Sequence, residues 1–438
     1  MSHEPPTVVV GGGFGGLAAA YELVRHGEPC CLLEASPELG GLAGTFEFDG
    51  VRLEKFYHHW FNHDRAILDL IADLGLQDRV TVNPGDVGMY YANSVFRLRS
   101  PLDLLRLGAV PLVDRVRTGL MALRARRIRD WQALDQITAA EWLVQHGGRR
   151  AFEVIWEPLL RGKFGKYADQ VSAIWIGNKL KLRGSSRSKS GRDELLYYQG
   201  GFGALADALA ADLRMKGVEI RLARPVTRVL TEQGHVTGVR IADGVIPARR
   251  VIVTTPLPIA LRLVPDLPEA YRQPAEQIDH LASVCLILVL ERSLSQSYWL
   301  NVNDPRFPFV AVIEHTRFDD PANYNGAHVV YLSRYTTTDD AMYAMSSDQL
   351  RDACVPYLKR MFPDFQPDWV RLHFSWRAEY TQPIVTRGYT KLIPDHKTPI
   401  AGLWFCTMAQ IWPEDRGTNY AVSYARQMVR EMLDAETG

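Results

Sequence analysis

A glycine-rich turn near the N-terminus constrains the fold of this chain more than any other feature of its sequence. Thr7 to Val10 is a short β-branched run, typical of a buried parallel strand, and it leads into Gly11-Gly12-Gly13-Phe14-Gly15-Gly16. Apolar residues then recur at helical spacing from Leu17 to His26, and Pro29 to Leu33 predicts a second buried strand. A strand, a G-x-G-x-x-G turn, a helix and a strand in this order predict a parallel βαβ unit.

The glycines of this turn, together with an acid at the end of the second strand, have separate tasks in binding a dinucleotide. Gly11 permits the tight turn, Gly13 lets the backbone approach a pyrophosphate, and Gly16 lets the helix pack closely on the strand. Glu34 stands where a carboxylate can accept hydrogen bonds from ribose hydroxyls. The alternative is that the glycines serve only a tight turn. The residues expected to bind the cofactor here are Gly11, Gly13, Phe14, Gly15, Gly16, Glu34 and Ala35.

A second glycine cluster, Gly40-Gly41-Leu42-Ala43-Gly44-Thr45, follows the acid and decides which dinucleotide we expect. Here the sequence resembles the flavin-containing amine oxidase superfamily, which includes protoporphyrinogen oxidases and carotenoid desaturases. The resemblance implies a non-covalent FAD, with Gly40, Gly41, Leu42 and Thr45 at its diphosphate. Many members have arginine after the glycine pair, so Leu42 removes one charged contact that the family pattern implies.

The resemblance continues toward the C-terminus. Tyr198 to Leu205 is similar to the family's Gly-Gly turn before a helix, and Val226 matches a valine whose backbone contacts the adenine in relatives. Asp415 to Val422 looks like the final loop and helix, whose N-terminal end faces the flavin in relatives. Thr407 to Gln410 replace the Gly-Asp pair of many members. The residues expected at the flavin edge are Arg416, Gly417, Thr418 and Asn419.

The order of these segments predicts an α/β fold in which a Rossmann-type FAD-binding domain is interrupted by a discontinuous substrate domain. We expect residues 1–95, 195–265 and 390–438 in the FAD-binding domain, and residues 96–194 and 266–389 in the substrate domain. The first substrate segment reads as largely helical. The second contains apolar runs typical of a mostly antiparallel sheet, at Ser283 to Leu290, Phe309 to Glu314, His328 to Arg334 and Val370 to Trp376.

The candidates for catalysis come from segments expected beside the flavin. His59 belongs to the aromatic and histidine-rich stretch from Glu54 to His63, and His59-Trp60-Phe61 loosely resembles the His-x-Phe element of UDP-galactopyranose mutases. A neutral imidazole there could hydrogen-bond the substrate or move a proton, whereas the alternative is plain aromatic packing. Arg387 and Tyr420 are candidates for substrate binding, with solvated loop residues as the alternative for Arg387. We expect no metal, because the histidine spacing is not joined by other ligands.

Composition sets limits on partners and compartment. Lys and Arg together number 50, as do Asp and Glu, so no overall charge favours nucleic acid. Five cysteines without a C-x-x-C pair, and a start unlike a signal peptide, predict the cytoplasm. No segment is apolar enough to span a membrane.

Residues 104–129 combine arginines with apolar residues, which predicts either an amphipathic helix on anionic lipid or a solvated basic face. The Ser-, Gly-, Lys- and Arg-rich stretch at 184–192 predicts a mobile surface loop, with an active-site lid as the alternative.

These features favour an FAD-dependent oxidoreductase that oxidises a small organic substrate by hydride transfer to flavin. The sequence has no second G-x-G-x-x-G for NAD(P)H, so we expect oxygen, a quinone or another acceptor as the oxidant. Two alternatives remain at this point. One is a non-redox, flavin-dependent mutase or isomerase acting on a nucleotide sugar, and the other is a flavin-binding protein without catalysis.

Overall fold

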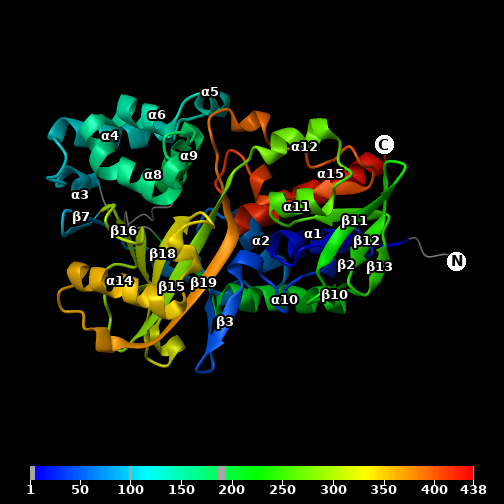
Figure 1. Ribbon diagram of the computed structural model, residues 1–438, viewed down its shortest axis with the longest axis horizontal. Coiled ribbons are helices and arrows are strands. Elements are labelled where there is room, and N and C mark those ends of the chain that lie inside the picture. Colours follow the sequence, from blue (N-terminus) through cyan, green and yellow to red (C-terminus); the bar gives the residue numbers. More distant parts are fainter. Residues whose placement is uncertain (1–4, 98–100, 186–193, 438) are drawn as a thin grey trace.

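The computed structural model describes residues 5–97, 101–185 and 194–437, and it folds into two adjoining parts built on separate sheets (Figure 1). One part contains a parallel sheet with helices α1, α10 and α15. The other contains a larger sheet with a group of helices above it. Most of the stretch predicted as a surface loop, residues 186–192, lies outside the described residues.

Five parallel strands form the first sheet in the order β10-β2-β1-β14-β20, so the chain crosses over in both directions from the central strand β1. Val9 pairs with Leu32 of β2 on one side and with Ile252 of β14 on the other. The strands are β1 (Thr7–Val10), β2 (Cys30–Leu33), β10 (Glu219–Arg221), β14 (Arg250–Val253) and β20 (Leu403–Phe405). This arrangement confirms the predicted parallel βαβ unit.

Both faces of the parallel sheet are covered, which explains why its strands are unbroken apolar runs. Val9 packs on one face with α1, α10 and α15, while Val8 and Val10 pack on the other face with a small antiparallel sheet. The helices on the first face are α1 (Phe14–Arg25), α10 (Gly201–Met215) and α15 (Thr418–Thr437), with α2 (Arg65–Asp73) beside α15. The second face carries β11 (Val226–Glu232), β12 (His235–Ile241), β13 (Gly244–Pro247), α11 (Leu257–Leu263) and α12 (Glu269–Glu276).

The second sheet has seven strands in the order β19-β15-β18-β17-β16-β7-β8 and is antiparallel except where β16 pairs with β7. Its strands are β7 (Val87–Tyr91), β8 (Ser94–Arg97), β15 (His280–Leu290), β16 (Trp299–Val302), β17 (Ala311–Glu314), β18 (His328–Thr336) and β19 (Val370–Pro383). Side chains of β15 alternate between two apolar clusters, because Ile287 packs toward the parallel-sheet part and Leu288 packs toward α14 (Ser347–Met361). The mostly antiparallel sheet is thus confirmed.

A group of helices lies above this sheet (Figure 1) and confirms the largely helical segment that the sequence predicts. Its members are α3 (Pro101–Leu105), α4 (Leu112–Ala125), α5 (Trp131–Asp135), α6 (Ala139–Gly147), α7 (Arg149–Ala151), α8 (Glu157–Phe164) and α9 (Ala173–Ser185), with one π-helical turn at Phe152–Trp156. A short helix, α13 (Ala341–Ala344), lies before α14.

Short strands connect the two parts. They are β3 (Thr45–Phe48) with β4 (Val51–Glu54), and the sheet β5-β9-β6, which is made of β5 (Trp60–Phe61), β9 (Glu194–Tyr198) and β6 (Val80–Pro84). The α/β fold class is confirmed. The residue limits assigned to the two domains remain a prediction, and β7 and β8 pair within the seven-stranded sheet although the sequence placed most of them with the first domain.

Candidate functional site

The first glycine turn has a backbone that only glycine fits. Gly11 has a φ of +112° and donates its N–H to Leu33 O at 2.9 Å, which holds the turn at the end of the sheet. A Cβ on Gly11 would lie 2.7 Å from Thr254 Oγ1, and a Cβ on Gly16 would overlap Gly11 O. Gly13 is the N-cap of α1, so no side chain caps the N–H groups of the first turn. These groups can therefore bind an anion.

The second glycine cluster lies directly against the first. Gly40 donates its N–H to Gly12 O at 2.9 Å, and Gly13 pairs with Gly40 as a short parallel bridge. A Cβ on Gly41 would stand 3.2 Å from Gly13 Cα, so side chains at both positions would fill the space between the segments. Leu42 follows as a half-buried residue, while Thr45 is buried and accepts a hydrogen bond from Arg52 Nε at 2.7 Å.

The carboxylate of Glu34 lies at the end of β2, beside the glycine turn. It accepts hydrogen bonds from Gly12 N at 2.5 Å and from Ser36 N at 2.7 Å. A carboxylate has about four lone-pair sites, so two remain for ribose hydroxyls. Ala35 is exposed next to it. The backbone of Arg224 donates to Glu34 O at 2.8 Å, which brings the start of β11, and with it Val226, to the same end of the sheet.

The start of α15 is fixed beside α1. A Cβ on Gly15 would lie 3.8 Å from Ala421 O, so α15 runs directly past the first turn of α1. Thr418 Oγ1 accepts a hydrogen bond from Trp60 Nε1 at 2.7 Å, and Asn419 Oδ1 accepts one from Ile67 N at 3.1 Å. Gly417 is exposed at the entrance to the helix.

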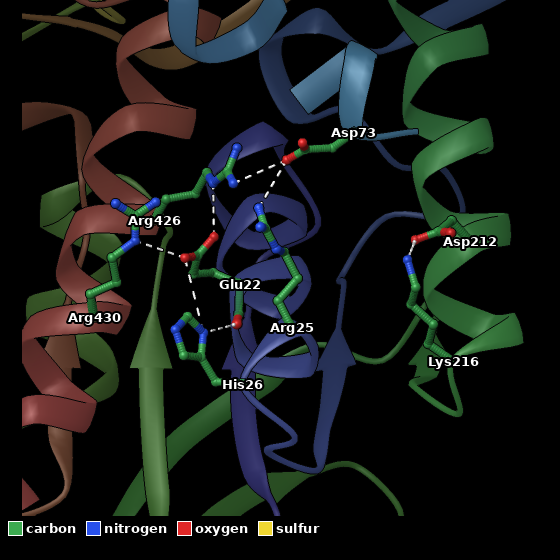
Figure 2. Close-up of polar contacts among 8 residues, drawn as sticks. All are labelled: Glu22, Arg25, His26, Asp73, Asp212, Lys216, Arg426 and Arg430. Atoms are coloured by element: carbon green, nitrogen blue, oxygen red, sulfur yellow. Dashed lines mark hydrogen bonds and ion pairs between the residues drawn. The ribbon is translucent and has the colours of Figure 1, made fainter. Parts of the chain in front are cut away.

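Ion pairs farther along α15 hold it against α1 and α2 (Figure 2). The buried carboxylate of Glu22 on α1 accepts from Arg426 Nε at 2.8 Å and from Arg430 Nε at 2.7 Å. Arg426 also bonds Asp73 of α2 at 3.1 Å, and Asp73 in turn bonds Arg25 at 2.9 Å. Burial alone would raise the pKa of Glu22, but hydrogen bonds from Arg430 and Arg426 outweigh burial and lower it. The network therefore fixes the helix whose start lies beside the glycine turns.

The segment from Lys55 to Trp60 runs from the second glycine cluster to the start of α15. Lys55 N donates to Gly44 O at 3.0 Å at one end, and Trp60 bonds Thr418 at the other. The side chains between these anchors are half-buried. His58 makes a ring-nitrogen hydrogen bond with Phe56 O at 2.6 Å, and burial lowers the pKa of His58 to about 4. Its imidazole is therefore neutral at physiological pH.

The structure brings together the cofactor candidates and places the three catalytic candidates in different surroundings. His59 Nδ1 lies 2.9 Å from Tyr298 OH, inside a group of rings that includes Trp299 and Phe318. Tyr420 is half-buried in the first turn of α15, where burial raises its pKa. Arg387 is exposed and lies near Glu141. Its backbone N–H donates a hydrogen bond to Gln170 O at 3.1 Å. The surface position of Arg387 does not support the role predicted for it.

One polar group in this region was missed by the sequence reasoning. Asp415 lies between Lys163 of α8 and Lys179 of α9, at 3.5 Å and 3.0 Å, and accepts from Gln382 Nε2 at 3.1 Å. Lysines of the helical segment carry no motif, so nothing local in the sequence signals that they meet the loop before α15.

No cluster of three or more histidine, cysteine, aspartate or glutamate side chains in the described part of the chain is placed to bind a metal ion. None of the helices described combines the length and apolar character needed to cross a lipid bilayer.

Comparison with known proteins extends over nearly the whole chain. The sequence model of a family described as flavin containing amine oxidoreductase matches residues 14–432. Hydroxyneurosporene desaturase of Cereibacter sphaeroides is 29% identical over 289 residues, which cover 57% of this chain and 55% of the desaturase. Coproporphyrinogen III oxidase of Bacillus subtilis is 27% identical over 294 residues, which cover 60% of this chain and 62% of the oxidase. The chain thus spans little more than half the length of these relatives.

Solved structures share the fold at lower identity. An oxidoreductase from Methanosarcina mazei has a TM-score of 0.74 at 19% identity, over 98% of this chain and 100% of the other. Reduced UDP-galactopyranose mutase has a TM-score of 0.74 at 14% identity, over 98% and 96% of the two chains.

Proposed function

This chain belongs to the flavin containing amine oxidoreductase family, and on that premise we propose that it is an FAD-dependent oxidoreductase that dehydrogenates or desaturates a small organic substrate. FAD is the cofactor that the family implies. The observation that carries the proposal is the contact between the two glycine segments, Gly40 N to Gly12 O at 2.9 Å, beside the carboxylate of Glu34.

The residues present fit FAD. A Cβ added to Gly13 would have a single neighbouring atom within 4 Å, the Cα of Gly41 at 3.9 Å. The backbone of Gly13 is therefore open to a diphosphate that lies between the two glycine segments. The uncapped start of α1 offers N–H groups to its charge, and Glu34 has lone pairs left for the ribose. The start of α15, with Gly417 and Thr418, would hold the far end of the cofactor.

When bound, FAD supplies a two-electron oxidant that accepts a hydride from a substrate C–H bond. The chain's own residues orient the reactants and keep water out. The first N–H groups of α15 would present a positive helix end to the flavin, which would stabilise negative charge on the reduced ring. The neutral imidazole of His58 can accept or donate a hydrogen bond but holds no charge at neutral pH. Its neighbour Tyr57 packs against the seven-stranded sheet, where it donates to Ser333 Oγ and contacts the ring of Trp299, and so borders the site on that side.

The test uses the purified full-length protein. We expect a flavin absorbance spectrum and FAD release on denaturation. Under anaerobic conditions, amines, porphyrinogens and polyprenoids are then screened for bleaching of the flavin, and the reduced protein is mixed with oxygen or a quinone to identify the acceptor. A colourless protein that takes up no added FAD refutes the proposal. Rapid bleaching by NAD(P)H contradicts the expected acceptor.

Mutase chemistry has no observation in its favour. The likeness to UDP-galactopyranose mutase is one of fold, at 14% identity. His59, whose neighbourhood suggested it, packs against Tyr298 and other rings. Turnover of a nucleotide sugar after dithionite reduction, without any electron acceptor, would restore this alternative.

We propose in addition that helices α3 and α4 rest on an anionic membrane surface. Large apolar side chains are exposed along both helices, and on α4 they follow the spacing 112, 116, 120 and 123, which places them on one side of the helix. Val113 is 70% exposed. The opposite side of α4 is buried at Thr118, Met121 and Ala125. The exposed members of this α3–α4 apolar surface are Leu102, Leu105, Leu112, Val113, Val116, Leu120 and Leu123.

The charge around this surface favours lipid phosphates over a neutral partner. Arg106, Arg117 and Arg124 are exposed beside it, whereas Asp114, the one acid of α4, points inward and accepts from Arg150 N at 3.2 Å. Apolar side chains bordered by arginines are typical of helices that lie in the interface of anionic bilayers.

Vesicle sedimentation tests this second proposal. The full-length protein should sediment with vesicles that contain phosphatidylglycerol and much less with phosphatidylcholine alone. The double variant Val113→Ser, Val116→Ser should stay in solution, while the matched control Val245→Ser, which changes an exposed valine on β13, should bind like the wild type. Equal sedimentation of the double variant and the wild type would contradict the docking surface.

For the compartment we propose the cytoplasm. All five cysteines are free and buried in the structure, which suits a reducing environment. Fractionation of cells should place the protein in the cytosolic fraction or on the cytosolic side of a membrane, and recovery outside the cell contradicts the proposal.

A further inference from the structure

Four charged side chains meet in front of the start of α15. We call Lys163, Lys179, Asp415 and Arg416 the cation cluster, because it contains three cations and a single carboxylate, with which the two lysines form ion pairs. Asp415 lies 3.5 Å from Lys163 Nζ and 3.0 Å from Lys179 Nζ. Arg416 Nη2 donates to Tyr335 OH at 2.9 Å.

Asp415 accepts hydrogen bonds from three further donors besides its two ion pairs with the lysines. These donors are Trp175 Nε1, Gln382 Nε2 and Arg416 N, each at 3.1 Å. Burial alone would raise the pKa of Asp415, but the charges of Lys163, Lys179 and Arg416 hold it well below its usual value. The carboxylate is therefore ionised and supplies a single negative charge.

The surroundings of the cluster are largely aromatic. The ammonium of Lys163 lies 5.3, 4.7 and 5.2 Å from the ring centres of Phe164, Trp175 and Tyr335. Lys179 lies 4.9 Å from the same Trp175 ring. Among the described residues, Asp415 is the one carboxylate within ion-pair distance of either lysine. An excess of buried positive charge is unfavourable, and burial indeed lowers the pKa of Lys163 well below its usual value.

The cluster adjoins the region assigned to the cofactor. Arg416 directly precedes Gly417 and Thr418, which begin the helix beside the first glycine turn. The charge of Arg416 acts on both Tyr57 and His58, which belong to the segment between the two anchors of the site. The side chains of Lys163 and Asp415 are largely buried, at 12% and 15% exposed, whereas that of Lys179 is 37% exposed and can be reached by a ligand.

We propose that the cation cluster binds an anionic group of the substrate, a carboxylate or a phosphate, and so places the rest of the molecule at the flavin. The proposal rests on the proposed function for the location of the flavin. An incoming anion supplies the negative charge that Asp415 alone does not provide, and it can take hydrogen bonds from Lys163 and from the guanidinium of Arg416, whose Nε has no partner in the structure of the described residues. The substrate class is thus an organic acid or a phosphate ester.

Calorimetric titration of the FAD-loaded protein with benzoate and with inorganic phosphate tests this inference. We expect saturable binding of one anion per chain, and the tighter of the two probes identifies the group. Lys163→Met should weaken binding by about tenfold or more, as expected when one charge-assisted hydrogen bond is lost. The matched control is Lys181→Met, because Lys181 on α9 lies 4.9 Å from the ring of Trp131 and donates to a backbone oxygen instead.

The outcomes separate this inference from the proposed function. FAD content and the circular dichroism of each variant are measured first, and Lys179→Met, a more exposed site, provides the second test if Lys163→Met does not fold. A protein that retains FAD but binds neither anion, or that binds equally in Lys163→Met and Lys181→Met, overturns the cluster as an anion site. Anion binding by a protein that takes up no FAD supports the cluster while refuting the proposed function.

Discussion

Replacing Glu22 by glutamine should loosen α15, the helix that borders the proposed flavin site. The carboxylate is 3% exposed and accepts from two arginines of α15, at 2.8 and 2.7 Å. Breaking a buried ion pair by removing one partner costs about 3–5 kcal/mol. Arg426 keeps its contact to Asp73 at 3.1 Å, and Arg430 is 53% exposed and can turn to water. We therefore expect the lower end, about 3 kcal/mol.

Thermal unfolding measures this effect. With an unfolding entropy of about 2.1 cal/mol/K per residue over 438 residues, 3 kcal/mol lowers the Tm by about 3 °C if the chain unfolds as one unit. The control is Glu276→Gln, which breaks a half-exposed pair with Arg272 at 3.3 Å and should shift the Tm by less than about 1 °C.

The pH dependence gives a second check on the same variant. Glu22 has a pKa below its usual value of 4.5 in the folded protein, so its stabilisation is complete above that value and is lost as the pH falls through the folded pKa. The Tm gap between wild type and Glu22→Gln should be constant at neutral pH and narrow under acid conditions. A gap that widens on acidification, or one no larger than that of Glu276→Gln, refutes the reasoning.

Three further predictions concern the cofactor site and the thiols. Gly16→Ala should yield protein without FAD, since its Cβ would overlap Gly11 O, whereas Gly108→Ala, with open space around it, should retain FAD in the absorbance spectrum. Glu34→Gln should raise the Kd for FAD by roughly 10–100-fold through loss of charged hydrogen bonds, with Glu47→Gln unchanged by fluorescence titration. Burial raises the pKa of the Cys31 thiol to about 11 and of the Cys30, Cys354 and Cys406 thiols to about 12, so thiol reagents should react slowly until the protein is denatured.

The parts of the fold that the sequence predicted are those set by local spacing. The unit from Thr7 to Leu33 depends on a turn, a helix and two strands that are neighbours in the chain, so glycine positions and apolar runs suffice to predict it. Long apolar runs such as that of β15 predict strands for the same reason. The match to the family over residues 14–432 confirms the resemblance drawn from the glycine clusters.

Contacts between distant segments could not be read from the sequence. The parallel pairing of β7 with β16 joins Val87 to Trp299, and no local pattern marks it. Lys163 and Asp415 are 252 residues apart in the chain. His58 and His59 are neighbours with the same composition around them. Contacts with distant residues distinguish their surroundings, such as Tyr298 against His59 and Phe202 against His58.

The order in which the parallel sheet is completed has a consequence for synthesis on the ribosome. Strand β1 and helix α1 emerge first, but β20 begins at Leu403 and α15 at Thr418, and α15 covers the apolar side of α1. A nascent chain that stalls before Thr418 lacks one of the two helices that pack on α1, and it lacks the helix start proposed to hold the cofactor. We therefore expect FAD to bind stably only after the residues of α15 have been synthesised.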